Sequence, residues 1–377
     1  MARLALACVV LVFLAACGGS DKDGAARAPG VQFTPAAAHR LDAALAEKVA
    51  DTGVPGASAA VVFADGREWS GAAGDAVLHP RQAMTTATAI PFDSITKIVT
   101  ASTAMRLVEQ GRLRLEDPIR RWYPAWRGDP EATVRDLLGH TSGLMRGPPD
   151  AYFMRVYAHP RVTATRQRFV VATGKPSPRT EGEEYSDAGF VLAGLILERA
   201  GGAPIAALAR RDVLSAPGGD GLAFQPGERP APPHAHSYWY PHSADRPVDF
   251  NDRSGVLPRR AWVTQASGAI GLAGDVPSLA RWGSKLLGGR VLKPSSLQEM
   301  RDFHSGEDWA GYGLGLAKSS VDDHELWGHT GDGLGTHTEL WYMPKERVTV
   351  AVAWNDNDID DDGGIFQALV RAAVGSG

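Results

Sequence analysis

The sequence predicts a mixed α/β protein of the α+β type. Strands from both chain ends would form one antiparallel sheet flanked by helices, and a mainly helical lobe would be inserted between them. Pairs of strand-like runs occur near each end, and the residues between them have mainly helical periodicity. The 377 residues exceed the roughly 250–300 at which one core usually stops growing. We therefore expect a two-lobed domain over residues 36–377, with the helical insertion at about 118–262.

The first 35 residues indicate export, followed by a tether. Arg3 precedes an apolar run at residues 4–13, which is too short to span a bilayer as a finished helix but is typical of a signal peptide. The run ends in LAAC, which resembles a bacterial lipobox, so we expect cleavage of residues 1–16 and a lipid on Cys17. Residues 17–35 would be a flexible tether to the outer face of an envelope membrane. Ordinary signal cleavage and secretion is the alternative.

Bulk composition excludes several other classes of protein. Both cysteines, Cys8 and Cys17, lie in the N-terminal segment, so the body has no disulfide framework. The net charge is −4 and no cluster of basic and aromatic residues occurs. We therefore expect no nucleic-acid partner.

The N-terminal part of the body begins with a predicted amphipathic helix. Its apolar residues recur every four positions up to a stop at Gly53. Two strand-like runs follow, at residues 57–63 and 67–73. Asp65-Gly66 between them is a strong hairpin signal.

The C-terminal part repeats this pattern in reverse order. Residues 336–343 and 348–354 are strand-like and flank a turn at 344–347. A closing helix is predicted next, because apolar residues recur at helical spacing. Its buried face would consist of Ile365, Phe366, Leu369, Val370 and Ala373.

The middle of the chain is predicted to be mainly helical. Helical periodicity is clear at Val134–Leu138, Phe190–Arg199 and Val276–Leu287. Residues 216–262 are dense in proline and glycine, so we expect a long, mostly irregular excursion there.

A serine and a lysine at the start of another predicted helix are the first candidates for catalysis. Asp93 is the expected N-cap, and the helix would run from Ser94 to about Gln110. Ser94 falls on the apolar stripe, and Lys97 one turn later places its Cβ about 5–6 Å away. Burial lowers the pKa of a lysine, so its amine can take the serine proton. A surface lysine that follows a serine by chance is the alternative, and the spacing alone is weak.

Six short motifs in a fixed order make the interpretation more specific. They are residues 92–97, 113–118, 133–144, 185–190, 312–316 and 328–331. Their sequences resemble those of the penicillin-recognising serine hydrolases, which include class C β-lactamases, D-Ala-D-Ala carboxypeptidases and related esterases. The resemblance covers roughly residues 35–375.

This resemblance implies a β-lactamase/transpeptidase-like fold and a complete set of site residues. Ser94 would be the acylated nucleophile, and Lys97 and Tyr185 would share the general-base work. The backbone N–H groups of Ser94 and Asp332 would form the oxyanion hole. The substrate-binding residues would be Asp187, His329, Thr330 and Gly331. No metal or organic cofactor is implied.

Two positions depart from the family pattern. Asp187 replaces the commoner asparagine, and an ionised carboxylate only accepts hydrogen bonds. It could instead pair with Lys97 and keep the amine charged. His329 stands where efficient β-lactamases usually have lysine, and it would be cationic only below about pH 6.5.

These departures favour a D-Ala-D-Ala carboxypeptidase-like enzyme or an esterase, acting on amide or ester bonds of small substrates, over a β-lactamase. A non-catalytic, lipid-anchored penicillin- or peptidoglycan-binding module is the alternative from another class. Histidines 234, 236 and 242 are interpreted as loop residues rather than metal ligands, and residues 358–363 as an acidic turn rather than a calcium loop. The histidine and serine of the motif at 140–143 are interpreted as a structural turn.

Overall fold

The protein is represented by a computed structural model that describes residues 30–149, 152, 165–240, 246–306, 309–356 and 364–375. The predicted signal peptide, Cys17, most of the tether, His242 and the acidic turn at 358–363 lie outside the described residues.

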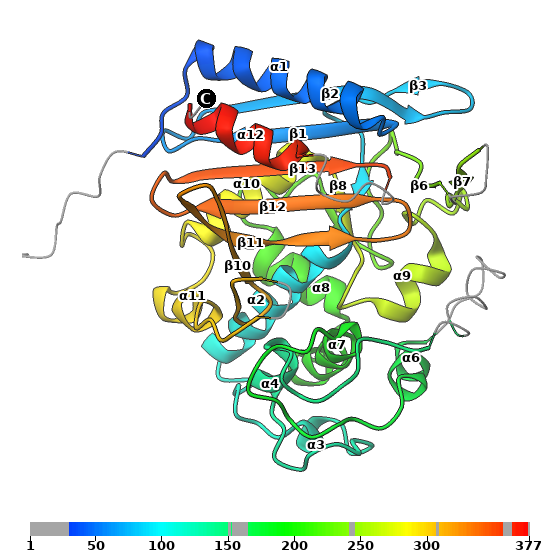
Figure 1. Cartoon of the computed structure of the whole chain (residues 1–377). Coiled ribbons are helices and arrows are strands. Elements are labelled where there is room, and N and C mark those ends of the chain that lie inside the picture. Colours follow the sequence, from blue (N-terminus) through cyan, green and yellow to red (C-terminus); the bar gives the residue numbers. More distant parts are fainter. Residues whose placement is uncertain are drawn as a thin grey trace, which may run out of the picture.

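One broad antiparallel sheet organises the molecule (Figure 1). Its eight strands follow the order β3-β2-β1-β13-β12-β11-β10-β9. The strands are β1 (Gly56–Val62), β2 (Glu68–Val77), β3 (Gln82–Ala83), β9 (Gly311–Tyr312), β10 (Ala317–Val321), β11 (His324–Asp332), β12 (His337–Met343) and β13 (Val348–Trp354). β1 and β13 are neighbours, with Ala57 opposite Trp354, so the two chain ends meet at the centre of the sheet. The predicted architecture is confirmed.

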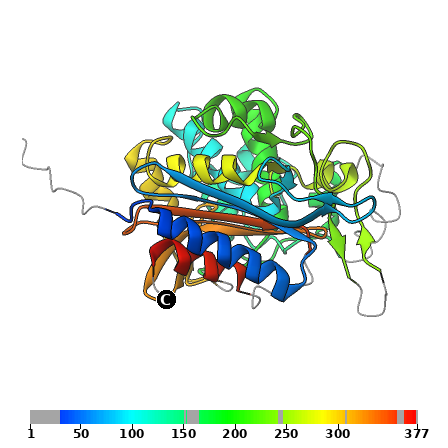
Figure 2. The same ribbon diagram turned by 90° about the horizontal axis from the view of Figure 1, so that it is seen from above.

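Helices cover both faces of this sheet (Figure 2). α1 (Pro35–Thr52) and α12 (Ile365–Val374) lie side by side on one face, and α10 (Val276–Leu287) lies on the other. Every residue of β1 and β13 is buried, as expected for strands covered on both faces. Two separate hydrophobic clusters result, one between the sheet and the terminal helices and one between the sheet and the helical lobe.

The predicted end of α1 and the predicted inner face of α12 are both observed. Thr34 caps α1 by accepting a hydrogen bond from the Ala37 N–H at 3.0 Å. Gly53 ends the helix with a φ of 73°, a conformation that favours glycine. The five residues predicted for the inner face of α12 are all buried.

The lobe on the other face is built around two central helices, α2 (Thr96–Glu109) and α7 (Asp187–Gly201). Eleven of the fourteen residues of α2 are buried. The surrounding helices are α3 (Ile119–Trp122), α4 (Val134–Leu138), α6 (Arg166–Ala172), α8 (Ile205–Ala209), α9 (Arg260–Ala266) and α11 (Pro294–Met300). No single helix in the described ranges is long and apolar enough to cross a membrane; α7 passes that test only together with Ile205–Leu214, across a bend of 72°.

The excursion at residues 216–262 is mostly irregular, as predicted, but contains short strands that the sequence did not reveal. They are β5 (Leu222–Phe224), β6 (Tyr238–Trp239) and β7 (Val248–Asp249). β5 belongs to a small sheet with β8 (Leu272–Gly274) and β4 (Ile90–Pro91). β4 directly precedes the segment that carries Ser94, so this small sheet fixes the approach to the nucleophile.

Candidate active site

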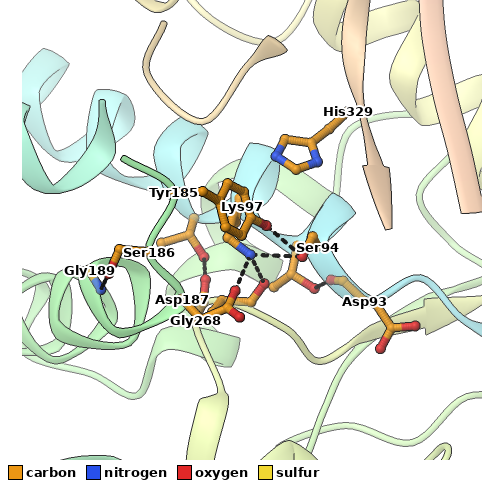
Figure 3. Close-up of polar contacts among 12 residues, drawn as sticks. Asp93, Ser94, Lys97, Tyr185, Ser186, Asp187, Gly189, Gly268 and His329 are labelled. Atoms are coloured by element: carbon orange, nitrogen blue, oxygen red, sulfur yellow. Dashed lines mark hydrogen bonds and ion pairs between the residues drawn. The ribbon is translucent and has the colours of Figure 1, made fainter. Parts of the chain in front are cut away.

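The predicted nucleophile and its lysine are in contact. Ser94 lies in η1, a 3₁₀ turn at Asp93–Ile95 that leads into α2. The Lys97 ammonium is completely buried, and its Nζ lies 2.8 Å from Ser94 Oγ (Figure 3). A surface lysine is therefore excluded.

The prediction that Asp93 caps this helix is wrong. Its φ is 40°, and its carboxylate accepts a hydrogen bond from the Thr336 hydroxyl at 2.7 Å. Because Thr336 lies in the connection between β11 and β12, Asp93 ties the nucleophile turn to the sheet. Burial raises the pKa of Asp93 to about 7, against the effect of the Thr336 hydrogen bond.

Tyr185 brings a second polar group to the nucleophile. Its hydroxyl lies 2.8 Å from Ser94 Oγ. Ser186, the next residue, caps α7 by accepting a hydrogen bond from the Gly189 N–H at 3.0 Å. The cap fixes where α7 begins and therefore where Tyr185 projects (Figure 3).

Asp187 pairs with Lys97, as its departure from the family pattern suggested. Asp187 Oδ1 lies 2.7 Å from Lys97 Nζ, and about a third of the aspartate side chain is exposed. Burial lowers the pKa of Lys97, and the Asp187 charge opposes this effect without cancelling it. Asp187 therefore restores part of the basicity that the amine loses on burial, but does not return it to its ordinary pKa.

The turn at 140–143 supports Tyr185. His140 is buried with a φ of 60°, and its Nδ1 accepts a hydrogen bond from the Ser186 N–H at 3.0 Å. Its ring centre lies 4.5 Å from that of Tyr185. Burial lowers the pKa of His140 well below its ordinary value, so the ring is neutral with its proton on Nε2. The structural interpretation of this turn is thus consistent with its contacts, which also position a site residue.

The motif at residues 328–331 lies on β11, directly against the nucleophile turn. A Cβ on Gly331 would lie 2.4 Å from the carbonyl oxygen of Phe92, so only glycine allows this approach. Thr330 and Asp332 line the cavity next to Ser94. The two N–H groups predicted for the oxyanion hole therefore belong to segments that border one cavity.

His329 is neutral and is not among the residues that line this cavity. It is fully buried, with Nε2 3.1 Å from the Tyr312 hydroxyl. Burial, with the nearby Lys97 charge, lowers the pKa of His329 to about 3. The expectation that it becomes cationic below about pH 6.5 is wrong because the ring is buried. The sequence alone does not show this burial.

Two ion pairs of His337 stabilise the end of β11. His337 Nδ1 lies 2.5 Å from Asp332, and its Nε2 lies 2.9 Å from Glu339. Burial disfavours a charged ring, but the two carboxylates outweigh it and raise the pKa of His337 to about 10. A permanent imidazolium therefore clamps the residue whose N–H is predicted to bind the oxyanion.

The cavity over Ser94 has a volume of about 220 Å³. Its lining residues are Ser94, Arg146, Tyr185, Asp187, Trp309, Thr330 and Asp332. Sequence reasoning missed Arg146 and Trp309. Arg146 lies two residues beyond a recognised motif, and no local pattern marks Trp309.

Nothing in the described part of the chain gathers three histidine, cysteine or acidic side chains in a way that could hold a metal ion. His236, one of the loop histidines, lies 2.7 Å from Asp249.

The sequence profile of the Beta-lactamase family matches residues 41–373. Penicillin-binding protein 4* of Bacillus subtilis (strain 168) is 25% identical over 321 residues, which cover 80% of this chain and 67% of that protein. Esterase EstB of Burkholderia gladioli is 34% identical over 113 residues, which are 28% of this chain and only 29% of that esterase.

Solved structures of similar fold include two hydrolases. The D-amino acid amidase from Ochrobactrum anthropi SV3, complexed with L-phenylalanine amide, superposes with a TM-score of 0.77 at 25% identity over 90% of this chain and 99% of that one. A D-stereospecific amidohydrolase from Streptomyces sp. gives a TM-score of 0.74 at 26% identity over 91% and 98% of the two chains. These matches confirm the predicted β-lactamase/transpeptidase-like fold.

Proposed function

This chain belongs to the Beta-lactamase family and is a serine hydrolase, and we propose that it cleaves amide bonds of small D-amino-acid peptides or amides through a Ser94 acyl-enzyme. The observation that carries the proposal is the position of Ser94 Oγ, 2.8 Å from both Lys97 Nζ and the Tyr185 hydroxyl. Similarity over nearly the whole chain to a D-amino acid amidase and a D-stereospecific amidohydrolase supports an amide substrate.

Acylation begins with attack of Ser94 Oγ on the scissile carbonyl carbon. The serine proton moves to the Lys97 amine as the new C–O bond forms, and the carbonyl electrons move to the oxygen. That oxygen is stabilised by the backbone N–H groups of Ser94 and Asp332. Collapse of the intermediate breaks the C–N bond, and the leaving amine takes a proton from the Tyr185 hydroxyl, which Lys97 replenishes. Water then attacks the acyl-enzyme by the reverse proton path.

Electrostatics favour Lys97 over Tyr185 as the group that accepts the first proton. Burial lowers the pKa of Lys97, which increases the share of neutral amine. Burial and the Asp187 charge raise the pKa of Tyr185 well above its ordinary value, which disfavours a phenolate. Tyr185 therefore serves as a neutral phenol that transmits a proton.

Ester hydrolysis is the second candidate, supported by the partial match to esterase EstB. β-Lactam hydrolysis is less favoured, because the two solved structures of similar fold are an amidase and an amidohydrolase. A non-catalytic binding module is disfavoured by the contact of Ser94 with both proton-transfer groups.

The test uses the purified domain with a fluorophosphonate probe, a fluorescent penicillin, a D-amino acid amide, a D-Ala-D-Ala peptide, p-nitrophenyl acetate and nitrocefin. We expect fluorophosphonate labelling and amide turnover, with losses of about a thousand-fold or more in Ser94→Ala. Ser320→Ala, an exposed serine on β10, is the matched control. Labelling by neither probe in the wild-type protein would support the binding module, and turnover of the ester alone would support an esterase.

We also propose that the mature protein is held at the outer face of an envelope membrane by a lipid on Cys17. The LAAC sequence after the apolar run supports this, and each buried methylene of an acyl chain contributes about 0.8 kcal/mol to membrane binding. Growth of a bacterial host with radiolabelled palmitate should label the wild-type chain and not Cys17→Ala. Equal labelling of the two, or a wild-type protein that appears only in the soluble fraction, would contradict the anchor.

A further inference from the structure

One cationic side chain at the mouth of the cavity has no role in the mechanism above. Arg146 lines the same cavity as Ser94, and its guanidinium lies 4.9 Å from the ring centre of Tyr185. Its backbone carbonyl accepts a hydrogen bond from the Asp187 N–H at 2.8 Å, which ties the Arg146 backbone to the start of α7. The side chain itself is exposed.

The charges around the cavity leave Arg146 as its available cation. Lys97 is fully buried and contacts Ser94 and Asp187, and His329 is neutral. Asp332, the other acidic group on the cavity wall, is paired with His337 at 2.5 Å. Across the described residues, no acidic side chain lies within 4.0 Å of the Arg146 guanidinium. A guanidinium with no acidic partner among the described residues suits an external carboxylate.

Its position indicates which part of the substrate it meets. Tyr185 donates the proton to the leaving nitrogen, and Arg146 lies over the ring of Tyr185. One residue of peptide spans at most about 3.6 Å, so a carboxylate on the leaving residue stays close to that nitrogen. A carboxylate on the leaving residue would therefore lie near Tyr185, whose ring Arg146 overlies.

We propose that Arg146 binds a free carboxylate on the leaving group, which makes the preferred substrate a peptide with an uncapped C-terminus. The inference rests on the proposed function and narrows it from amide hydrolysis in general to carboxypeptidase-like cleavage. Arg146 supplies the positive charge that a lysine at position 329 would otherwise provide, because the buried His329 is neutral. Bidentate hydrogen bonding between a planar guanidinium and a carboxylate increases affinity for the substrate and fixes its orientation.

A matched pair of substrates tests the proposal. N-acetyl-L-Lys-D-Ala-D-Ala and its C-terminal amide differ only in the carboxylate. We expect the wild-type enzyme to prefer the acid, and Arg146→Gln to lower kcat/KM for the acid about 10- to 100-fold, mainly through KM. Turnover of the amide and of p-nitrophenyl acetate should change less than about threefold. Arg146→Lys should restore part of the preference, and Arg168→Gln, an exposed arginine on α6, is the control.

Protection against fluorophosphonate labelling by the two peptides provides a readout that needs no turnover. Stronger protection by the acid, lost in Arg146→Gln, supports the proposal. Equal kcat/KM for acid and amide in the wild type overturns the proposal. An equal loss of kcat/KM for acid, amide and ester in Arg146→Gln also overturns it, because it would show that Arg146 acts through Tyr185. A wild-type protein that cleaves amides without preferring the acid contradicts this inference alone, whereas absence of labelling and of all turnover contradicts the proposed function.

Discussion

Asp187 sets how readily Lys97 becomes a base. Its carboxylate lies 2.7 Å from Lys97 Nζ and raises the pKa of the amine, against the lowering by burial. An amide at this position would remove the opposing charge with little change of shape. The substitution therefore separates the electrostatic role of Asp187 from its place at the start of α7.

We predict that Asp187→Asn shifts the acidic limb of the pH profile of kcat/KM to lower pH. The acidic limb rises as the base loses its proton, and without Asp187 the pKa of Lys97 is lower, so the active form appears at lower pH. The profile would be measured with p-nitrophenyl acetate, which has no carboxylate to repel. A limb that stays in place or moves to higher pH would show that Lys97 is not the group that titrates.

Asp93 gives a pH dependence to stability. Its pKa is about 7 in the folded protein and about 3.8 when exposed. Above pH 4 the unfolded chain releases this proton while the folded protein keeps it until about pH 7, so stability falls across that interval. The three-unit difference corresponds to about 4 kcal/mol.

Asp93→Asn should remove this fall. Asparagine tolerates the φ of 40° and can still accept the Thr336 hydrogen bond through its amide oxygen. Urea unfolding at pH 4.5 and pH 8 should show a variant that gains stability relative to wild type as pH rises. Parallel changes in the two proteins would mean that Asp93 ionises normally in the folded state.

At the scale of elements, the contact of β11 with η1 decides the geometry of catalysis. A Cβ on Gly331 would lie 2.4 Å from the Phe92 carbonyl oxygen, and both groups belong to the backbone. Gly331→Ala must therefore push the strand and the nucleophile turn apart. Because the predicted oxyanion hole draws one N–H from each segment, its two donors would separate.

We expect Gly331→Ala to slow acylation about 100-fold or more, since small displacements of reacting groups have effects of that size. Stopped-flow labelling with the fluorophosphonate probe would measure the rate. Gly194→Ala in α7 is the control, because its Cβ would meet no atom closer than 3.4 Å. A similar loss in both variants would indicate general destabilisation instead.

Elements with strong local signals were predictable from the sequence, and elements that depend on distant contacts were not. α1 has a four-residue apolar repeat and a glycine stop, and α10 matches its predicted range of Val276–Leu287. The strands β5 to β7 span two or three residues each, which is too short for any periodicity. The Ser94–Lys97–Tyr185 contact followed from ordered motifs. The orientation of Asp93 did not, because its partner Thr336 lies 243 positions away.

At the scale of the whole molecule, the sheet makes the two chain ends and the site one cooperative unit. β1 and β13 pair at its centre, and α12 packs beside α1 over them. The opposite face of the same sheet carries the helical lobe, and β11 contacts the nucleophile turn. Loss of the terminal helix should therefore destabilise the active site through the sheet, although α12 does not line the cavity.

Leu369→Ala tests this coupling. Leu369 lies fully buried on the inner face of α12, so its truncation should cost about 2–5 kcal/mol of unfolding free energy. Arg371→Ala on the same helix removes only an ion pair with Asp322 in which both side chains are about half exposed, and should cost less than about 1 kcal/mol. In urea, ellipticity and fluorophosphonate labelling should disappear at one midpoint, and Leu369→Ala should lower both midpoints together. Labelling that survives after the ellipticity of the sheet is lost would show that the helical lobe holds the Ser94–Lys97–Tyr185 contact without the sheet.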